Sequence, residues 1–159
     1  MFVDSERMES SIPVAVRTRV RTGPMAAAQV VPLPTVTRSR ALILDDCRFI
    51  AERVARALSL RGFDSVLAGD GYVGLELLRT HRFDLLVLDL EIPVVDGFTL
   101  LRQLRDDPDY AEIPVLVLAS DRQAAELDRA RALALGASSY LGKPLQLRSL
   151  NAAFDSILG

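Results

Sequence analysis

Five short apolar runs alternate with five longer segments of helical spacing after residue 39, and this alternation limits the fold more than any other feature. Short apolar runs bounded by turn residues or charges are typical of buried strands. Residues 42–44, 85–88 and 115–118 are apolar at every position, as expected for strands covered on both faces. Strands that alternate with helices predict a parallel sheet between two helical layers. The sequence therefore predicts a doubly wound α/β domain.

The boundaries of the elements follow from the same pattern. The strands are expected at about 41–45, 64–68, 84–89, 114–119 and 138–141. The helices are expected at about 48–61, 71–80, 97–106, 121–135 and 145–158. Gly62 follows the first helical segment and is a typical stop signal for a helix.

Residues 1–38 lack a sustained apolar period and contain four prolines. We therefore expect a flexible tail at 1–38 and a folded domain at 39–159. The tail is basic, because it carries five arginines against three acids. The whole chain has a net charge of -2, which gives no electrostatic case for nucleic-acid binding.

The single cysteine, Cys47, excludes an intramolecular disulfide and a multi-cysteine zinc site, and we expect a partly buried, inert thiol. No apolar stretch approaches the roughly 18 residues that a membrane span needs. Acidic residues near the N-terminus argue against a signal peptide. We therefore expect a cytoplasmic protein with no membrane partner.

Lys143 is the only lysine among 19 basic residues. A replaceable surface charge in such a chain would be an arginine, so Lys143 indicates a specific role. It follows the fifth apolar run, whereas the pair Asp45–Asp46 follows the first and Asp89 ends the third. Functional groups of doubly wound sheets gather at the carboxyl ends of strands. We therefore expect these four residues to form one site.

Carboxylates that crowd together repel one another unless a cation neutralises them. Mg2+ prefers carboxylate, carbonyl and water oxygens arranged in an octahedron. An aspartate beside a divalent cation and an ammonium group can attack a phosphoryl group, because the cations screen the incoming charge and stabilise the acyl phosphate. We therefore predict that this site binds Mg2+ as the cofactor for phosphoryl transfer to an aspartate.

These residues resemble the receiver domain of two-component response regulators, such as the chemotaxis regulator, over about 40–158. The resemblance implies a flavodoxin-like (βα)5 sandwich with a five-stranded parallel sheet of order 2-1-3-4-5, and a bacterial signalling role. The motifs that carry it are Asp45–Asp46, the segment 89–97 (Asp-Leu-Glu-Ile-Pro-Val-Val-Asp-Gly), Gly136–Ala137, Tyr140 and Lys143–Pro144.

The resemblance also implies a role for each acid. Asp89 is the expected phosphoacceptor. The expected Mg2+ ligands are Asp46, Asp89 and the backbone carbonyl of Glu91, with Asp45 acting through a water molecule. Asp96 is expected to cap a helix and to take no part in the chemistry.

The same resemblance assigns Lys143 to the phosphoryl group and to an ion pair with Asp89, and it makes Pro144 the cis turn that aims Lys143. The phosphoryl group is expected to come from a histidine kinase or a phosphotransfer protein. Beyond self-phosphotransfer and autodephosphorylation, we expect no enzymatic activity.

One family residue is missing. Receivers carry Thr or Ser at the end of the fourth strand, where this chain has Ala119, with Ser120 one step beyond. In the family that hydroxyl bonds the phosphoryl group, and the aromatic residue of the fifth strand, here Tyr140, packs into the space that opens. Ser120 could supply the bond from a shifted loop, phosphorylation could drive a weaker switch, or the domain could signal without phosphorylation.

Side chains alternate along a strand, so Ser120 tends to face away from the Ala119 position. The acid pocket argues against a phosphorylation-independent domain. We therefore expect Asp89 to accept phosphate and Ala119 to weaken the switch. In receivers Glu91 and Asp121 occupy positions that influence the lifetime of the acyl phosphate, and the sequence leaves the direction of their effect open.

The chain ends after its fifth helix, so we expect a single-domain regulator without a DNA-binding domain. Its output would be binding to an unknown protein target, through the fourth and fifth helices or the tail. We expect a monomer, or a weak dimer through the fourth helix and fifth strand. The alternatives are a receiver-like module that binds partners without phosphorylation, and an aspartyl-phosphate phosphatase of the haloacid-dehalogenase type. That phosphatase motif needs Asp where this chain has Glu91.

Overall fold

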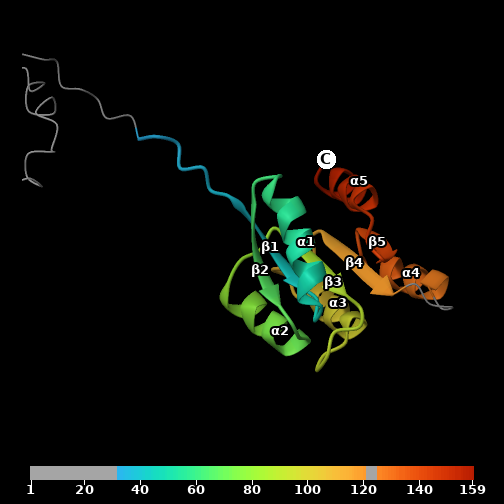
Figure 1. Ribbon diagram of the computed structural model, residues 1–159. Coiled ribbons are helices and arrows are strands. Elements are labelled where there is room, and N and C mark those ends of the chain that lie inside the picture. The colour runs from blue at the N-terminus through green and yellow to red at the C-terminus, as the bar shows by residue number, and fades with distance from the viewer. Residues whose placement is uncertain (1–31, 121–124) are drawn as a thin grey trace, which may run out of the picture. The chain divides into compact units, whose positions relative to one another are not determined.

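The computed structural model describes residues 32–120 and 125–159 (Figure 1). One compact unit spans Thr37–Gly159. Residues 32–38 contain no helix or strand. The tail expected at 1–38 lies mostly outside the described residues, so the tail and the domain boundary at residue 39 stay predictions.

Strands and helices alternate strictly within the compact unit (Figure 1). The strands are β1 (Ser39–Leu44), β2 (Phe63–Ala68), β3 (Leu85–Asp89), β4 (Val115–Ser120) and β5 (Ser139–Lys143). The helices are α1 (Arg48–Ser59), α2 (Gly71–Thr80), α3 (Gly97–Asp106), α4 (Ala125–Ala134) and α5 (Leu147–Leu158).

All five strands are parallel and lie in the order β2-β1-β3-β4-β5. The predicted doubly wound sheet of order 2-1-3-4-5 is therefore confirmed. The order reverses beside β1, which pairs with β2 on one side and β3 on the other. In folds of this kind the crevice at the carboxyl ends of the strands next to this reversal holds the functional site.

Two apolar clusters cover the two faces of the sheet. Leu42 and Leu44 of β1 pack in one cluster with residues of α2, α3 and α4. Ala41 and Ile43 pack in the other with residues of α1 and α5. Because neighbouring strand residues point to opposite faces and both faces are covered, the middle positions of the central strands, 42–44, 85–88 and 115–118, are all apolar.

Three boundaries differ from the sequence-based expectations. β5 extends through Lys143 instead of ending near residue 141, because its pairing with β4 continues at Ala119–Gly142 and Ser120–Lys143. α1 ends at Ser59, and Gly62 takes a φ of +83° in the turn that follows. α4 is described from Ala125, and the expected helical residues 121–124 lie outside the described part. No helix in the described ranges is long and apolar enough to cross a lipid bilayer.

Candidate functional site

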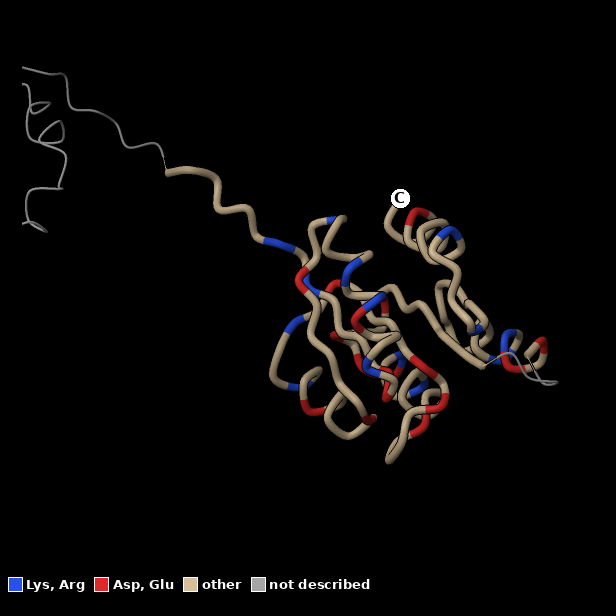
Figure 2. Tube along the Cα trace, viewed as in Figure 1, with Lys and Arg blue, Asp and Glu red and all other residues tan. Residues whose placement is uncertain are grey.

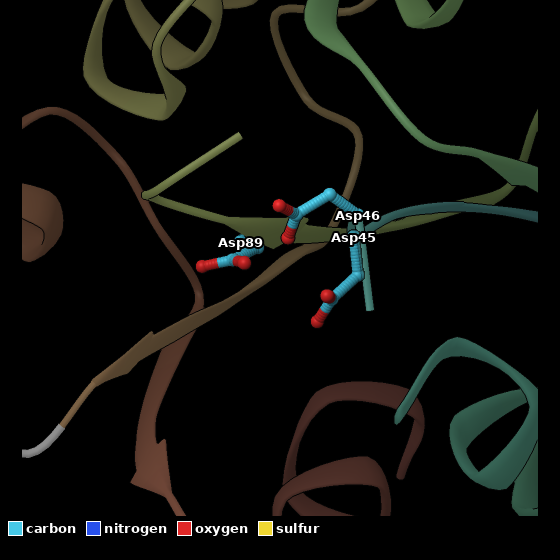
Figure 3. Close-up of side chains that lie close together, drawn as sticks. All are labelled: Asp45, Asp46 and Asp89. Carbon is cyan, nitrogen blue, oxygen red and sulfur yellow. The ribbon is translucent and has the colours of Figure 1, made fainter. Parts of the chain in front are cut away.

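Three carboxylates from two neighbouring strands meet at the carboxyl edge of the sheet. Asp89 is the last residue of β3, and Asp45 and Asp46 follow β1, its sheet neighbour. One carboxylate oxygen of each residue lies within 4.8 Å of those of the other two. Figure 3 shows the carboxyl group of Asp46 turned toward that of Asp89. Asp45 and Asp89 are buried, whereas Asp46 is exposed.

Lys143 joins this cluster from β5. Its Nζ lies 2.9 Å from Asp45 Oδ2 and 3.0 Å from Asp89 Oδ2, and its side chain is only 16% exposed. The Lys143–Pro144 peptide bond is cis, as expected for Pro144. The structure therefore brings together all four charged residues that the sequence placed in one site.

Main-chain donors fix the two buried carboxylates. The Cys47 N–H donates to Asp45 Oδ1 at 2.8 Å, and the Glu91 N–H donates to Asp89 Oδ1 at 3.1 Å. Gly97 lets the start of α3 approach the site, since a Cβ there would come within 2.8 Å of the Asp89 carbonyl oxygen. The Cys47 thiol is exposed, so the expectation that it is partly buried is wrong. It lies in the loop before α1, outside the packed core.

Burial and charge act in opposite directions on the pKa values of the ion pair. Burial raises the pKa of Asp89 above its ordinary value, although the Glu91 N–H and the Lys143 ammonium group oppose the shift. Burial lowers the pKa of Lys143, but hydrogen bonds to Asp45 and Asp89 outweigh it, and the net shift is upward. Lys143 therefore stays charged at neutral pH.

The cluster fits a hard divalent cation. Oxygen ligands of octahedral Mg2+ at about 2.1 Å are separated by roughly 3.0–4.2 Å. The three carboxylate oxygens, all within 4.8 Å of one another, need to close only slightly to reach that geometry. Figure 2 shows further acidic residues along the loop from β3 to α3. The backbone carbonyl of Glu91 and a water on Asp45 remain predicted ligands.

At position 119, where receivers carry a hydroxyl, this chain has a small apolar side chain. Ala119 is buried and belongs to the cluster that packs on α2, α3 and α4, and Tyr140 packs against the same cluster. The Ser120 hydroxyl donates to Glu91 Oε2 at 2.8 Å. Asp121, the second residue expected to flank the site, lies outside the described residues.

Two features of the site had not been foreseen. The Ser120–Glu91 hydrogen bond joins side chains 29 residues apart, and only the β3–β4 register could have revealed it. Val94, in the β3–α3 loop, takes a φ of +72°, which a β-branched residue rarely adopts. Valine at position 94 gives no sign of that conformation in the sequence, whereas glycine would have done so.

Comparisons with known proteins agree with this geometry. Residues 41–155 match the family described as the response regulator receiver domain. Response regulator MprA of Mycobacterium ulcerans (strain Agy99) is 40% identical over 119 residues, which are 75% of this chain and 50% of that protein. MprA of Mycobacterium avium (strain 104) is 39% identical over the same share of each chain. This chain thus spans about half the length of the curated relatives it matches.

Solved structures show the same fold. The chemotaxis response regulator CheY4 of Vibrio cholerae superposes with a TM-score of 0.68 at 27% identity, covering 76% of this chain and 99% of CheY4. A response regulator from Chloroflexus aurantiacus J-10-fl gives a TM-score of 0.69 at 26% identity, with coverages of 77% and 99%.

A parallel sheet of order 2-1-3-4-5 with an acidic cluster at the carboxyl ends of its strands is the arrangement of a two-component receiver. The chain belongs to the response regulator receiver domain family. Receiver domains are signalling modules rather than classical enzymes.

Proposed function

We propose that the chain is a response regulator that accepts a phosphoryl group on Asp89. The observation that carries this proposal is the placement of the Asp89 carboxylate. It is buried at the end of β3, it contacts the Lys143 ammonium group, and it lies beside Asp45 and Asp46. A buried carboxylate next to a fixed cation and a cation-binding cluster is suited to nucleophilic attack on phosphorus.

In the proposed transfer, a carboxylate oxygen of Asp89 attacks the phosphorus of a phosphohistidine on a histidine kinase or phosphotransfer protein. The new O–P bond forms as the P–N bond breaks, and the imidazole leaves with the electron pair and takes up a proton. Lys143 neutralises charge on the incoming phosphoryl oxygens. Asp46, Asp89 and the Glu91 carbonyl would hold Mg2+, which screens the phosphoryl charge when bound. Hydrolysis by water returns free Asp89 and inorganic phosphate.

We also propose that phosphorylation controls binding to a protein target, in the cytoplasm, through the α4–β5 face. Among the α4 side chains, all of them described, Leu127 is 71% exposed and only Ala132 is buried. A lightly packed helix beside an edge strand is suited to reversible docking and to a weak dimer. The absence of a hydroxyl at Ala119 supports an atypical switch.

Labelling with acetyl phosphate tests the proposal, comparing wild type with Asp89→Asn in the presence and absence of Mg2+. We expect a base-labile and hydroxylamine-labile phosphate on wild type with Mg2+, and none on Asp89→Asn. No label on wild type would contradict the phosphoacceptor role and favour a binding module. Rapid turnover of phosphate esters by wild type would instead favour a phosphatase.

A further inference from the structure

The β3–α3 loop, residues 90–96, connects the proposed phosphoacceptor to α3 and contains Glu91, whose backbone carbonyl is a predicted Mg2+ ligand. Main-chain hydrogen bonds anchor both ends of this loop. The Leu90 N–H donates to the Leu118 carbonyl at 2.9 Å, and the Gly97 N–H donates to the Leu90 carbonyl at 3.2 Å. The position of Glu91 between these ends therefore depends on what holds the middle of the loop.

The middle of the loop is a strained γ-turn. The Val95 N–H donates to the Pro93 carbonyl at 2.9 Å across Val94, whose φ is +72°. A γ-turn with a positive φ at its central residue is rare and strained, and a β-branched side chain there adds to the strain. Val94 is 78% exposed, so packing of its own side chain offsets little of it. Contacts made by neighbouring residues therefore keep the turn in this form.

The first residue of α2 supplies such a contact where the loop passes the start of the helix (Figure 1). The Gly71 N–H donates to the Pro93 carbonyl at 3.0 Å, so this carbonyl accepts a second hydrogen bond from outside the loop. Gly71 also lies very close to Val95. A Cβ at position 71 would overlap the Val95 carbonyl oxygen and come within 2.7 Å of the Val95 Cβ. Glycine is therefore required for α2 to approach the loop this closely.

The segment that leads into α2 contacts the site on both sides. The Ala68 carbonyl accepts a hydrogen bond from the Asp45 N–H at 3.1 Å, and the Gly71 N–H binds the loop that carries Glu91. Neither Ala68 nor Gly71 belongs to the acidic cluster. Their hydrogen bonds nevertheless connect one residue of the cluster to the loop that carries a further predicted ligand.

We propose that Gly71 is a positioning residue for the cation site. Its N–H and its lack of a side chain hold the strained β3–α3 loop where the Glu91 carbonyl can bind Mg2+. This rests on the Mg2+ site of the proposed function. Mg2+ needs nearly octahedral oxygen ligands at about 2.0–2.1 Å, so it tolerates little displacement of a ligand. Groups that orient metal ligands typically change metal affinity about 10–100-fold when they are altered.

Gly71→Ala and Gly69→Ala form a matched pair two residues apart. Non-bonded carbon atoms ordinarily lie about 3.5 Å apart, so the Cβ of Gly71→Ala should push the backbone at Val95 away by about 1 Å. A Cβ at Gly69 would meet nothing within 4 Å. Leu78→Val truncates a buried side chain near the other end of α2 and controls for a loss of stability alone.

The experiment is a Mg2+ titration of each folded variant, followed by the NMR shift of the Cys47 amide, which is hydrogen bonded to Asp45. Urea unfolding without Mg2+ measures stability separately. Gly71→Ala is expected to raise the Mg2+ dissociation constant about tenfold or more. Gly69→Ala and Leu78→Val are expected to keep the dissociation constant of wild type, although Leu78→Val is less stable.

Pro93→Gly tests the same contact from the loop, at an exposed position where folding is not at risk. Glycine keeps the carbonyl that accepts from Gly71 but frees the backbone of the turn, so the loop is held less firmly. It should raise the Mg2+ dissociation constant about threefold, as expected when the conformational restriction of a proline is lost.

Equal Mg2+ dissociation constants in wild type and Gly71→Ala would overturn the positioning role and leave the cation site intact. Leu78→Val that binds Mg2+ as weakly as Gly71→Ala does would also overturn it, since stability alone would then explain the loss. If Gly71→Ala did not fold, an unchanged dissociation constant in Pro93→Gly would overturn the proposal. Wild type without a Mg2+-dependent shift would overturn the proposed cation site and the positioning role with it.

Discussion

Lys143 Nζ lies 3.0 Å from Asp89 Oδ2, although the two residues come from strands that are not neighbours. β4 lies between β3, which carries Asp89, and β5, which carries Lys143. Two strand spacings are about 9.6 Å, which is longer than a lysine side chain. The pair therefore forms only because both side chains lean across the end of β4. Position 119, where β4 is crossed, carries the small side chain of Ala119.

Removing the ammonium group should destabilise the fold. Lys143→Met leaves two buried carboxylates, Asp45 and Asp89, without their partner, and loss of one member of a buried pair costs about 3–5 kcal/mol. Because the neighbouring Asp46 is exposed and water can reach this edge of the cluster, we expect a loss of about 2 kcal/mol, measured by urea unfolding without Mg2+. Adding Asp45→Asn to Lys143→Met should restore part of the loss. An unchanged double variant would argue against charge as the cause.

Mg2+ should stabilise the chain through the carboxylates. At ten times its dissociation constant, a ligand specific for the folded state adds about 1.4 kcal/mol, visible as a rise in Tm. Asp46→Asn should raise Tm without Mg2+, since it relieves repulsion within the cluster, and should abolish the Mg2+ response. The control Asp106→Asn removes an exposed carboxylate from α3 and should keep that response. If Mg2+ raised the Tm of both variants equally, the cation would bind somewhere other than at Asp46.

Ala119→Thr should strengthen the response to phosphorylation, because it restores a hydroxyl at the end of β4. Ala119 is buried, so the larger side chain should also cost about 1–2 kcal/mol of folding stability. Ala119→Val has the same shape without the hydroxyl and controls for packing. Exchange of α4 amides with acetyl phosphate is the measurement. Equal responses from the Thr and Val variants would exclude a role for the hydroxyl.

Asp96 should stabilise α3 in a pH-dependent way. Its side chain accepts from the N–H and the hydroxyl of Thr99, and these hydrogen bonds lower its pKa. A lowered pKa in the folded state means that the contribution is complete above the ordinary value near 4 and fades as pH falls below it. Asp96→Ala should cost about 1 kcal/mol at pH 7.

The matched variant Asp96→Asn keeps a capping oxygen that does not titrate. Its stability relative to wild type, from urea unfolding, should therefore improve as pH falls from 6 to 3. A difference that does not change with pH would show that ionisation of Asp96 contributes nothing.

Val94→Gly should stabilise the chain. Val94 is 78% exposed and has a φ of +72°, so glycine relieves strain with little loss of packing. We expect a gain of about 1 kcal/mol. Val94→Ala keeps a Cβ, which controls for the lost side chain, and should gain less. If alanine and glycine gave equal stability in thermal unfolding, backbone strain at this position would be excluded.

The layers of the fold and the charged members of the site could be predicted from the sequence. Strands covered on both faces are apolar throughout, and Asp45, Asp89 and Lys143 stand at or next to strand ends that any parallel sheet brings to one edge. Hydrogen-bond partners of side chains were harder to predict. Ser120 reaches Glu91 only because main-chain pairing of β3 with β4 sets the register. The exposure of Cys47 depends on the path of a loop, which apolar periodicity does not describe.

The solitary Lys143 also has a consequence for chemical reactivity. It is the only ε-amino group in the chain, and it is ion-paired with the proposed nucleophile. A reagent or enzyme that modifies lysine side chains can act on this chain only at Lys143, beside Asp45 and Asp89. Labelling of the Lys143 amine therefore reports whether its ion pairs with Asp45 and Asp89 are intact, with no background from other lysines of the chain.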